Sequence, residues 1–464
     1  MNVRVKFLGG ARSVTGSKYL LEVDDFNLLI DCGLFQGLKE LRRRNWDPFP
    51  IPPDKIDAVI LTHAHIDHTG YLPRLVDEGF SGPIYCTYPT FDLVKILLLD
   101  SAKLQEEEAQ FAKRKGYSRH ENPKPLYGTR EAEKVFPLMK SLGYKKTINI
   151  NEQISIRFQD AGHILGSAIV EMDLKGDSQN KKIVFSGDLG RYEQPVFYDP
   201  TPIKEADVLF IESTYGDRES LEEDVALEME NIINETVEAG GHLIIPAFAV
   251  GRTQVVIYYI RELMIQGRIP EMPIYVDSPM AISVTDLYKR NPTCHKLRDG
   301  RKESIFDYKH IKYQRSQQTS KLLNEQKKSA IIISASGMAT GGRVLHHLYH
   351  RLPNEKDTIL FVGFQAVGTR GRRLLDGEPM VKIFGQEVPV KAKIKRIYGL
   401  SAHADRSELF RWLDNFEDSP KFTFIIHGEP ESAMAFAEAI QERLDWYHVK
   451  VPDYLDAETL FWHI

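Results

Sequence analysis

Short apolar runs separated by turn residues dominate the first part of the chain and predict β-strands. The predicted strands are Val3–Leu8, Lys18–Val23, Phe26–Ile30, Ala58–Leu61, Pro83–Thr87, Ile154–Phe158, Ala168–Met172, Lys182–Phe185 and Val208–Ile211. Two longer stretches with helical spacing, Phe91–Lys115 and Arg130–Leu142, lie between them. Strand hairpins followed by strands that alternate with helices indicate an α/β fold in which helices cover sheets.

The pattern changes near residue 215, where strands and helices begin to alternate regularly. The helices are predicted at Leu221–Ala239 and Thr253–Ile265, and the strands at His242–Pro246, Ile274–Val276, Ile331–Ile333 and Thr358–Val362. This alternation predicts a second unit with a parallel sheet. The C-terminal tail again shows strand patterns. It also carries histidines that are the natural partners of a cluster of histidines and aspartates in the first part of the chain. We therefore expect residues 1–214 and 386–464 to form one discontinuous domain, interrupted by an inserted domain at 215–385.

The composition is that of an ordinary globular protein, with 42% apolar and 27% charged residues in a chain of 464. The net charge of −5 gives no overall basic field, so a nucleic acid would need a local patch. Three widely spaced cysteines without a CxxC pair indicate a reducing compartment. The sequence shows neither a signal peptide nor an apolar run of membrane-spanning length. We therefore expect a cytoplasmic protein with no membrane partner.

Histidines and aspartates gather in five short segments, and this set indicates a metal site. The segments are HAHIDH at 63–68, AGH at 161–163, GD at 187–188, SAHAD at 401–405 and IHG at 426–428. His63 and His65 follow an apolar strand, and residues two apart on an extended backbone point the same way, so both can bind one ion. Asp67 and His68 lie beyond the bend and can reach a second ion. Imidazole and carboxylate ligands favour zinc and also accept manganese or iron.

His163 and Asp188 also follow predicted strands, where loops gather into a site. A carboxylate can bridge two metals, and Asp188 is the best-placed candidate for that role. The alternative is a set of unrelated polar loop residues, but the ordered recurrence of the segments argues against it. Three further histidines, His346, His347 and His350, share a predicted helix without the glutamate of H-E-x-x-H. We interpret that helix as solvated or substrate-facing rather than as a third metal site.

Four motifs resemble those of the metallo-β-lactamase superfamily: HAHIDH, AGHILGS, SGDLG and the LIDCG segment that contains Asp31. The central insertion resembles the β-CASP branch, on the motifs ESTYG at 212–216, SAHAD, and HGE at 427–429. That branch contains the pre-mRNA 3′-end cleavage subunit and bacterial ribonuclease J. The resemblance covers nearly the whole chain. It implies a discontinuous αββα sandwich, an inserted β-CASP domain with a parallel α/β sheet, and a compact bacterial-type member.

The resemblance also implies two zinc ions per chain. The first ion would be held by His63, His65 and His163, and the second by Asp67, His68 and His427. Asp188 and a hydroxide would bridge the two ions, and Asp31 would orient a ligand histidine. Two dications outweigh the negative charges of the two aspartates and the hydroxide, which leaves net positive charge for an anionic substrate. Such a pair can activate the hydroxide and clamp a phosphoryl oxygen during in-line attack.

The leaving 3′ oxygen of a phosphodiester needs a proton, which histidines bound to metal cannot supply. His403 can supply it if the ring is protonated and close to the scissile bond. The resemblance pairs Glu212 with this histidine, and a nearby carboxylate would raise the pKa of His403 and orient its ring. The alternative for Glu212 is a surface acid at a strand end. By the same resemblance, Ser401 would hydrogen-bond a substrate phosphate.

A glycine-rich turn, SGMATGGR at 336–343, leads into a predicted helix and offers backbone N–H groups to a phosphate. We predict phosphate contacts from Gly341, Gly342, Arg343 and Arg370, although a plain strand-to-helix connection is the alternative. The turn lacks the Gly-Lys-Ser/Thr of an ATP-binding loop. A local basic track could include Arg252, Arg372, Arg373, Lys391, Lys393, Lys395 and Arg396.

These features predict a two-zinc ribonuclease that hydrolyses RNA by attack of the bridging hydroxide, with His403 as general acid. The expected partner is RNA, in single-stranded form, and a homodimer is left open. Endonuclease and 5′-exonuclease action are also both open. The alternatives are a hydrolase of a small ester, thioester, lactone or lactam, a DNA-directed nuclease, and a non-catalytic RNA-binding scaffold.

Overall fold

The computed structural model describes residues 1–115, 123–219, 224–297, 304–366 and 368–463. The chain divides into two compact units. The first contains Met1–Glu193, Tyr198–Glu219 and His403–Ile464, and the second contains Gln194–Phe197 and Ser220–Ala402. The first unit is therefore discontinuous and the second is inserted into it, as the sequence pattern predicts.

Two seven-stranded sheets form the first unit. One sheet has the order β22 (Ala457–Phe461), β1 (Val3–Gly9), β2 (Lys18–Val23), β3 (Phe26–Ile30), β4 (Ala58–Ile60), β5 (Ile84–Thr87) and β6 (Met139–Leu142). The other has the order β21 (Val449–Lys450), β20 (Phe422–Ile426), β11 (Val208–Glu212), β10 (Asn180–Phe185), β9 (Ala168–Lys175), β8 (Ile154–Asp160) and β7 (Thr147–Asn149). Both sheets are mixed, with parallel pairing from β3 to β6 and from β10 through β11 and β20 to β21.

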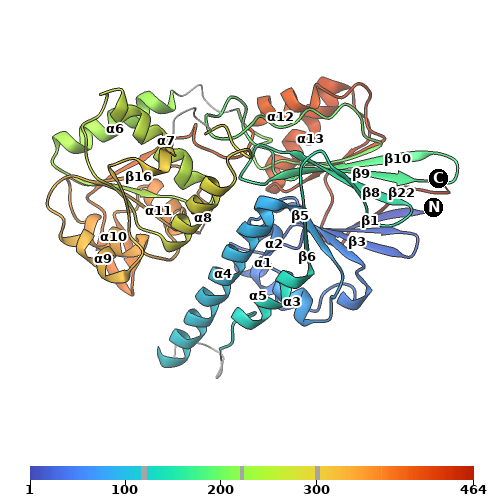
Figure 1. Cartoon of the computed structure of the whole chain (residues 1–464), viewed down its shortest axis with the longest axis horizontal. Helices are drawn as coiled ribbons and strands as arrows, with labels where there is room; N and C mark the ends of the chain where they lie inside the picture. The colour runs from blue at the N-terminus through green and yellow to red at the C-terminus, as the bar shows by residue number, and fades with distance from the viewer. Residues whose placement is uncertain (116–122, 220–223, 298–303, 367, 464) are drawn as a thin grey trace. The chain divides into compact units, whose positions relative to one another are not determined.

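Helices cover the outer faces of both sheets (Figure 1). Beside the first sheet lie α1 (Lys39–Arg44), α2 (Ile66–Thr69), α3 (Leu72–Asp77), α4 (Tyr88–Lys115) and α5 (Thr129–Val135). The second sheet is covered by α12 (Arg406–Leu413) and α13 (Pro430–Leu444), whose apolar faces pack on it around the buried Trp412 and Phe436. This arrangement is the predicted αββα sandwich.

The inner faces of the two sheets meet in one apolar core. Aromatic rings form its centre: the Phe185 and Phe210 rings stack with centroids 4.2 Å apart, and Phe424 lies 5.0 Å from Phe210. Each of these side chains is at most 1% exposed. Burial of this kind stabilises the fold by roughly 25 cal/mol per Å² of apolar surface. Because the core is closely packed, it also fixes the positions of the strand ends that carry the polar loops.

One predicted element differs in the structure. The helix predicted at Arg130–Leu142 ends as α5 at Val135, passes through a 3₁₀ turn at Phe136–Leu138 and continues as strand β6. β6 pairs in parallel with β5, from Ile84 opposite Met139 to Thr87 opposite Leu142. Its short run of residues is compatible with helical spacing, and only the sheet partner selects the extended form.

The second unit is built on a six-stranded sheet in the order β14 (Ile311–Tyr313), β13 (Ile274–Val276), β15 (Ile331–Ser334), β12 (Leu243–Pro246), β16 (Thr358–Phe361) and β19 (Lys393–Arg396). All of its strand pairs are parallel, as predicted. The unit also contains α6 (Val225–Glu238), α7 (Arg252–Ile265), α8 (Pro279–Arg290), α9 (Gln317–Leu322), α10 (Val344–Arg351), α11 (Arg370–Leu375) and the hairpin of β17 (Met380–Ile383) and β18 (Gln386–Pro389).

The predicted end of the insertion at residue 385 is too early. β19 pairs with β16 along its whole length, from Thr358 opposite Lys393 to Phe361 opposite Arg396. The second unit therefore extends to Ala402, and the chain re-enters the first unit at His403.

Two further features concern the chain as a whole. In the part of the chain that the structure describes, no helix combines the length and apolar character needed to cross a membrane. The three cysteines are not joined in disulfides, and Cys32 and Cys86 are buried.

Candidate metal centre

Six of the seven predicted ligand residues follow the ends of strands that have parallel neighbours in the two sheets of the first unit. The HAHIDH segment follows β4, Asp188 follows β10, and His427 follows β20. His163 lies in the loop between β8 and β9. Because the carboxyl ends of parallel strands meet at one edge, these loops can converge on one site.

The close approach of two loops requires glycine at position 33. A Cβ atom at Gly33 would lie 1.5 Å from the backbone oxygen of Asp67, so only glycine allows the two loops to meet. The Ser17 N–H also donates to that oxygen, at 2.9 Å, and the Cys32 N–H donates to the His68 oxygen at 2.7 Å. These backbone bonds hold the HAHIDH segment in place.

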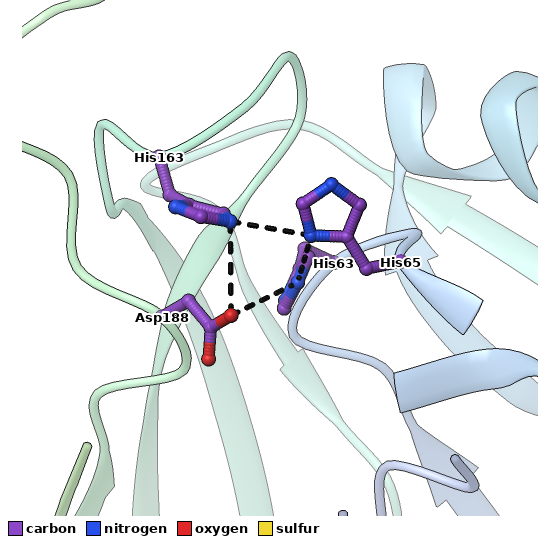
Figure 2. Close-up of side chains that lie close together, drawn as sticks. All are labelled: His63, His65, His163 and Asp188. Atoms are coloured by element: carbon purple, nitrogen blue, oxygen red, sulfur yellow. Dashed lines mark hydrogen bonds and ion pairs between the residues drawn. The ribbon is translucent and has the colours of Figure 1, made fainter. Parts of the chain in front are cut away.

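The first ligand group consists of His63, His65, His163 and Asp188 (Figure 2). Their candidate ligand atoms all lie within 4.8 Å of one another. His65 Nδ1 is 3.1 Å from His63 Nε2 and 3.2 Å from His163 Nε2. The three nitrogens and the Asp188 carboxylate face one small space, as Figure 2 shows.

The second group consists of Asp67, His68 and His427, whose candidate ligand atoms also lie within 4.8 Å of one another. His427 Nε2 is 3.2 Å from His68 Nε2 and 3.4 Å from Asp67 Oδ2. The first group therefore contains three histidines, His63, His65 and His163, and the second contains two, His68 and His427.

Asp188 faces both groups with different oxygens. Oδ2 lies 3.4 Å from His63 Nε2 and 3.6 Å from His163 Nε2. Oδ1 lies 3.4 Å from His68 Nε2 and 3.2 Å from His427 Nδ1. The carboxylate is 2% exposed, and Oδ1 is buried without a hydrogen-bond donor. A buried oxygen left in this state is costly unless a cation or proton compensates it.

The charges in this space favour bound cations. Burial raises the pKa of Asp188, although the charges of nearby histidines act against it. Burial lowers the pKa of His68, but the charges of Asp188 and Asp31 and a hydrogen bond to Asp31 outweigh it and raise that pKa to about 10. Burial and neighbouring histidines instead hold the pKa of His65 near 4. Without a metal ion, the carboxylates therefore hold a proton on His68, whereas His65 stays neutral. A cation bound beside Asp188 would take the place of that proton.

This set of donors fits a pair of metal ions. Imidazole nitrogens and carboxylate oxygens are zinc ligands, the two groups are separate, and the Asp188 oxygens divide between them. The Oδ1 atom without a hydrogen-bond donor is the observation that fits best, because a carboxylate that binds two metals needs both oxygens available.

His403 and Glu212 form a pair next to the ligands. His403 Nδ1 lies 3.2 Å from both Glu212 oxygens and 4.0 Å from Asp188 Oδ2. Glu212 is fully buried at the end of β11, and its oxygens also accept the backbone N–H groups of Leu189 at 2.7 Å and Thr214 at 3.2 Å. Glu212 is therefore not the surface acid that the alternative interpretation required.

The Glu212 carboxylate changes the acidity of its partner. Burial lowers the pKa of His403, but the charge and hydrogen bond of Glu212, together with the charges of Asp188 and Asp67, raise it to about 9. Burial raises the pKa of Glu212, yet the charge and hydrogen bond of His403 bring it below its ordinary value. The pair therefore favours an imidazolium held against a carboxylate.

The structure places the other predicted phosphate contacts in the second unit. Ser401 is half-buried there, and its N–H donates to the Tyr398 oxygen at 3.1 Å. Gly341 has open space at its Cβ position, and Gly342 has a positive φ of +78°, which favours glycine. The Gly341 N–H is directed at Ser336 Oγ, 3.4 Å away, so this turn partly satisfies its own donors.

The two arginines predicted to contact phosphate are held internally. Arg343 Nη1 donates to Asp277 and to the Gln314 oxygen, both at 2.7 Å, and Nη2 donates to the Arg315 oxygen at 2.8 Å. Arg370 donates through Nε and Nη2 to the Lys382 oxygen at 3.0 and 2.9 Å. These bonds argue against the predicted phosphate contacts and indicate a structural role for both side chains.

Several side chains of the predicted basic track also have acidic neighbours. The ion pairs join Arg372 to Asp376, Arg373 to Glu378, and Lys393 and Lys395 to Glu235. The histidine helix is mixed: His346 and His350 are exposed, whereas His347 is 1% exposed and lies 2.7 Å from Asp277. The histidines of this helix therefore do not face one metal site together.

Two threonines near the metal centre were missed by the sequence reasoning. Thr62 Oγ1 lies 2.8 Å from Asp31 Oδ2 and 3.1 Å from His63 Nδ1. Thr214 Oγ1 lies 3.4 Å from His427 Nδ1. Their positions directly before HAHIDH and inside ESTYG were the available signal.

Comparisons with known proteins agree with this geometry. Residues 14–233 match the metallo-β-lactamase superfamily, residues 253–374 the β-CASP domain, and residues 387–452 the Zn-dependent metallo-hydrolase RNA specificity domain. Ribonuclease TTHA0252 of Thermus thermophilus is 36% identical over 95% of this chain and 96% of its own length. The chain belongs to the β-CASP family of metallo-β-lactamase-fold proteins.

Other β-CASP relatives are similar over most of the chain. An RNase J-like protein of Methanocaldococcus jannaschii is 32% identical over 98% of both chains. The transcription termination factor FttA of Methanosarcina mazei is 31% identical over 95% of this chain and 69% of its own length. A solved structure of a protein of unknown function from Enterococcus faecalis, 13% identical, aligns over 99% of this β-CASP chain with a TM-score of 0.54 and shares its fold.

Proposed function

We propose that this β-CASP protein is a two-zinc ribonuclease that hydrolyses phosphodiester bonds of RNA. The observation that carries the proposal is Asp188, whose two oxygens face two separate groups of ligands, beside the His403–Glu212 pair. Bound as a pair, zinc ions would supply an activated hydroxide and positive charge for the phosphoryl oxygens. His63, His65, His163 and Asp188 would hold one ion, and Asp67, His68, His427 and Asp188 the other.

His403 supplies the proton that the leaving 3′ oxygen requires. Its Nδ1 is bound to Glu212, and the proton would be delivered from Nε2. Glu212 keeps the ring charged and fixes its direction, because its own two oxygens are anchored by backbone N–H groups. General acid catalysis of this kind contributes about 10²–10⁴-fold.

RNA is the proposed substrate because relatives of this chain carry ribonuclease names and residues 387–452 match an RNA specificity domain. We further propose that the RNA is single-stranded, that the protein acts in the cytoplasm, and that a homodimer is compatible with this activity. Manganese or iron could replace zinc, since the ligands are nitrogen and oxygen donors.

The test is cleavage of labelled RNA by metal-free protein to which zinc or manganese is returned. RNA labelled at the 5′ or the 3′ end separates internal cutting from 5′-exonuclease action, and 5′-hydroxyl and 5′-monophosphate forms test whether a 5′ phosphate is recognised. DNA of the same sequence and small esters, thioesters and lactams test the alternatives. Cleavage of RNA that needs two ions per chain supports the proposal. Zinc-dependent turnover of a small ester without cleavage of RNA would overturn it.

A further inference from the structure

Thr62 stands between Asp31 and His63 at the start of the HAHIDH segment. All three side chains are buried, with residue exposures of 2%, 1% and 0%. The Thr62 hydroxyl lies 2.8 Å from Asp31 Oδ2 and 3.1 Å from His63 Nδ1. It is also 3.5 Å from His68 Nδ1, but that nitrogen has the much shorter contact of 2.7 Å to Asp31 Oδ2. Polar groups in such an interior need defined partners, so the direction of each hydrogen bond matters.

The direction follows from the number of protons available. A hydroxyl has one proton, and an ionised carboxylate can only accept. Thr62 must therefore donate to Asp31, since the opposite arrangement would place two oxygen lone pairs 2.8 Å apart. A lone pair of Thr62 then accepts the proton on His63 Nδ1. This leaves His63 Nε2 unprotonated, and Nε2 is the atom that faces Asp188 Oδ2 at 3.4 Å.

The same Asp31 oxygen serves the second ligand group directly. It lies 2.7 Å from His68 Nδ1, which donates to it. His68 Nε2 faces the other Asp188 oxygen, Oδ1, at 3.4 Å. One carboxylate oxygen therefore orients a histidine in each group, one directly and one through a hydroxyl.

We propose that Thr62 is a positioning residue that fixes the tautomer of His63, so that Asp31 prepares one histidine for each metal ion. This inference rests on the proposed two-metal function. It predicts an asymmetry: loss of the Thr62 hydroxyl affects the group of His63, whereas loss of the Asp31 carboxylate affects both groups.

The surroundings of Thr62 allow this hydroxyl to be removed selectively. The Thr62 N–H donates to Asp31 Oδ1 at 2.8 Å, and replacing the Thr62 side chain by valine or serine leaves that bond in place. Valine has nearly the shape of threonine, and the Thr62 Cβ and methyl group lie against Gly187, next to Asp188. Thr62→Val therefore removes the hydroxyl alone, and Thr62→Ser keeps it as the matched control.

The experiment is a titration of metal-free wild type, Thr62→Val, Thr62→Ser and Asp31→Ala with Zn²⁺ in competition with a chromophoric chelator. We expect wild type and Thr62→Ser to bind two ions alike. Thr62→Val should bind one ion as wild type does and the other about 10–100-fold more weakly, as for other outer partners of metal ligands. Asp31→Ala should bind both ions more weakly.

Equal binding of two ions by wild type and Thr62→Val would overturn the inference alone. Equal weakening of both ions in Thr62→Val would also overturn it, because Thr62 would then not act on the group of His63 in particular. A wild type that binds a single ion would overturn the two-metal function as well. A measurement without any substitution of Thr62 gives a second test: long-range ¹H–¹⁵N spectra of zinc-loaded protein should show His63 protonated at Nδ1, and protonation at Nε2 would contradict the inference.

Discussion

Glu212→Gln is the most informative change at the candidate site, because the carboxylate is fully buried and has three hydrogen-bonding neighbours. Oε1 accepts the Leu189 N–H at 2.7 Å, and Oε2 accepts the Thr214 N–H at 3.2 Å. His403 Nδ1 lies 3.2 Å from each oxygen. Glutamine has one oxygen and one NH₂ group, so it cannot accept both backbone N–H groups.

The expected loss of stability follows from the hydrogen bonds that glutamine can and cannot make at this position. The glutamine oxygen should stay at Leu189, where the contact is shorter, and its NH₂ group should then face the Thr214 N–H. One buried donor left without an acceptor costs about 1–3 kcal/mol in the free energy of unfolding. His403 also loses its anionic partner, and complete loss of a general acid would lower kcat about 10²–10⁴-fold. Because His403 itself is still present in Glu212→Gln, we expect a smaller loss in kcat, of at least about tenfold.

Two assays check this prediction. Thermal unfolding should show a Tm lowered by several degrees, and RNA cleavage under saturating substrate should show the lower kcat with little change in metal content. Glu417→Gln is the matched control, because Glu417 forms an ion pair with Lys204 at the surface, where both side chains are more than two-thirds exposed. Such a pair contributes about 0–1 kcal/mol. A Glu212→Gln protein as stable and active as wild type would refute the hydrogen-bond accounting.

Three other changes test neighbouring parts of the reasoning. His403→Gln should lower kcat about 10²–10⁴-fold with both metals retained. The same change should lower kcat far less on RNA whose leaving 3′ oxygen is replaced by sulfur, because that leaving group does not need a proton. An equal loss of kcat on both substrates would contradict the role of proton donor. Removal of metal with a chelator should abolish cleavage and lower Tm, since ions at 100 times their Kd stabilise the folded state by about 2.7 kcal/mol; an unchanged Tm would argue against specific binding. Burial raises the pKa of Asp160 to about 7, although the Gly162 N–H and Lys145 act against it. The contribution of protonated Asp160 to the free energy of unfolding is therefore complete below about pH 4 and is lost as the pH rises through 7. In denaturant titrations, the free energy of unfolding of Asp160→Asn should therefore increase relative to that of wild type between pH 5 and pH 8. A difference between the two proteins that does not change with pH would refute this.

Most strands could be predicted because short apolar runs bounded by turn residues already indicate which segments are buried. The strands β2 and β3 have the predicted bounds, and β13 does as well. β6 was predicted as helix because its extended form depends on β5, some fifty residues earlier in the chain. The end of the insertion was misplaced for a related reason, since β19 is defined by its pairing with β16 rather than by its own residues.

The candidate metal ligands could be predicted because they lie in short motifs, and imidazole and carboxylate groups can be recognised as metal ligands without knowledge of their neighbours in the fold. The phosphate contacts were less predictable, because a sequence shows the charge of an arginine and not the acid or carbonyl that holds it. Arg343 is bound to Asp277, 66 positions away in the chain. Thr62 was overlooked because threonine is common and its importance here comes only from the two side chains on either side of its hydroxyl.

The wide separation of His68 and His427 has a consequence for how the protein is made. These residues lie 359 positions apart, yet their Nε2 atoms are 3.2 Å apart. Translation therefore delivers the first ligand group and Asp188 early, and delivers His403 and His427 only after the whole insertion. A chain whose synthesis has not reached residue 403 lacks both the last ligand and the proton donor. As a ribonuclease, the protein would be inert toward its own message until the ribosome had passed the codon of His427.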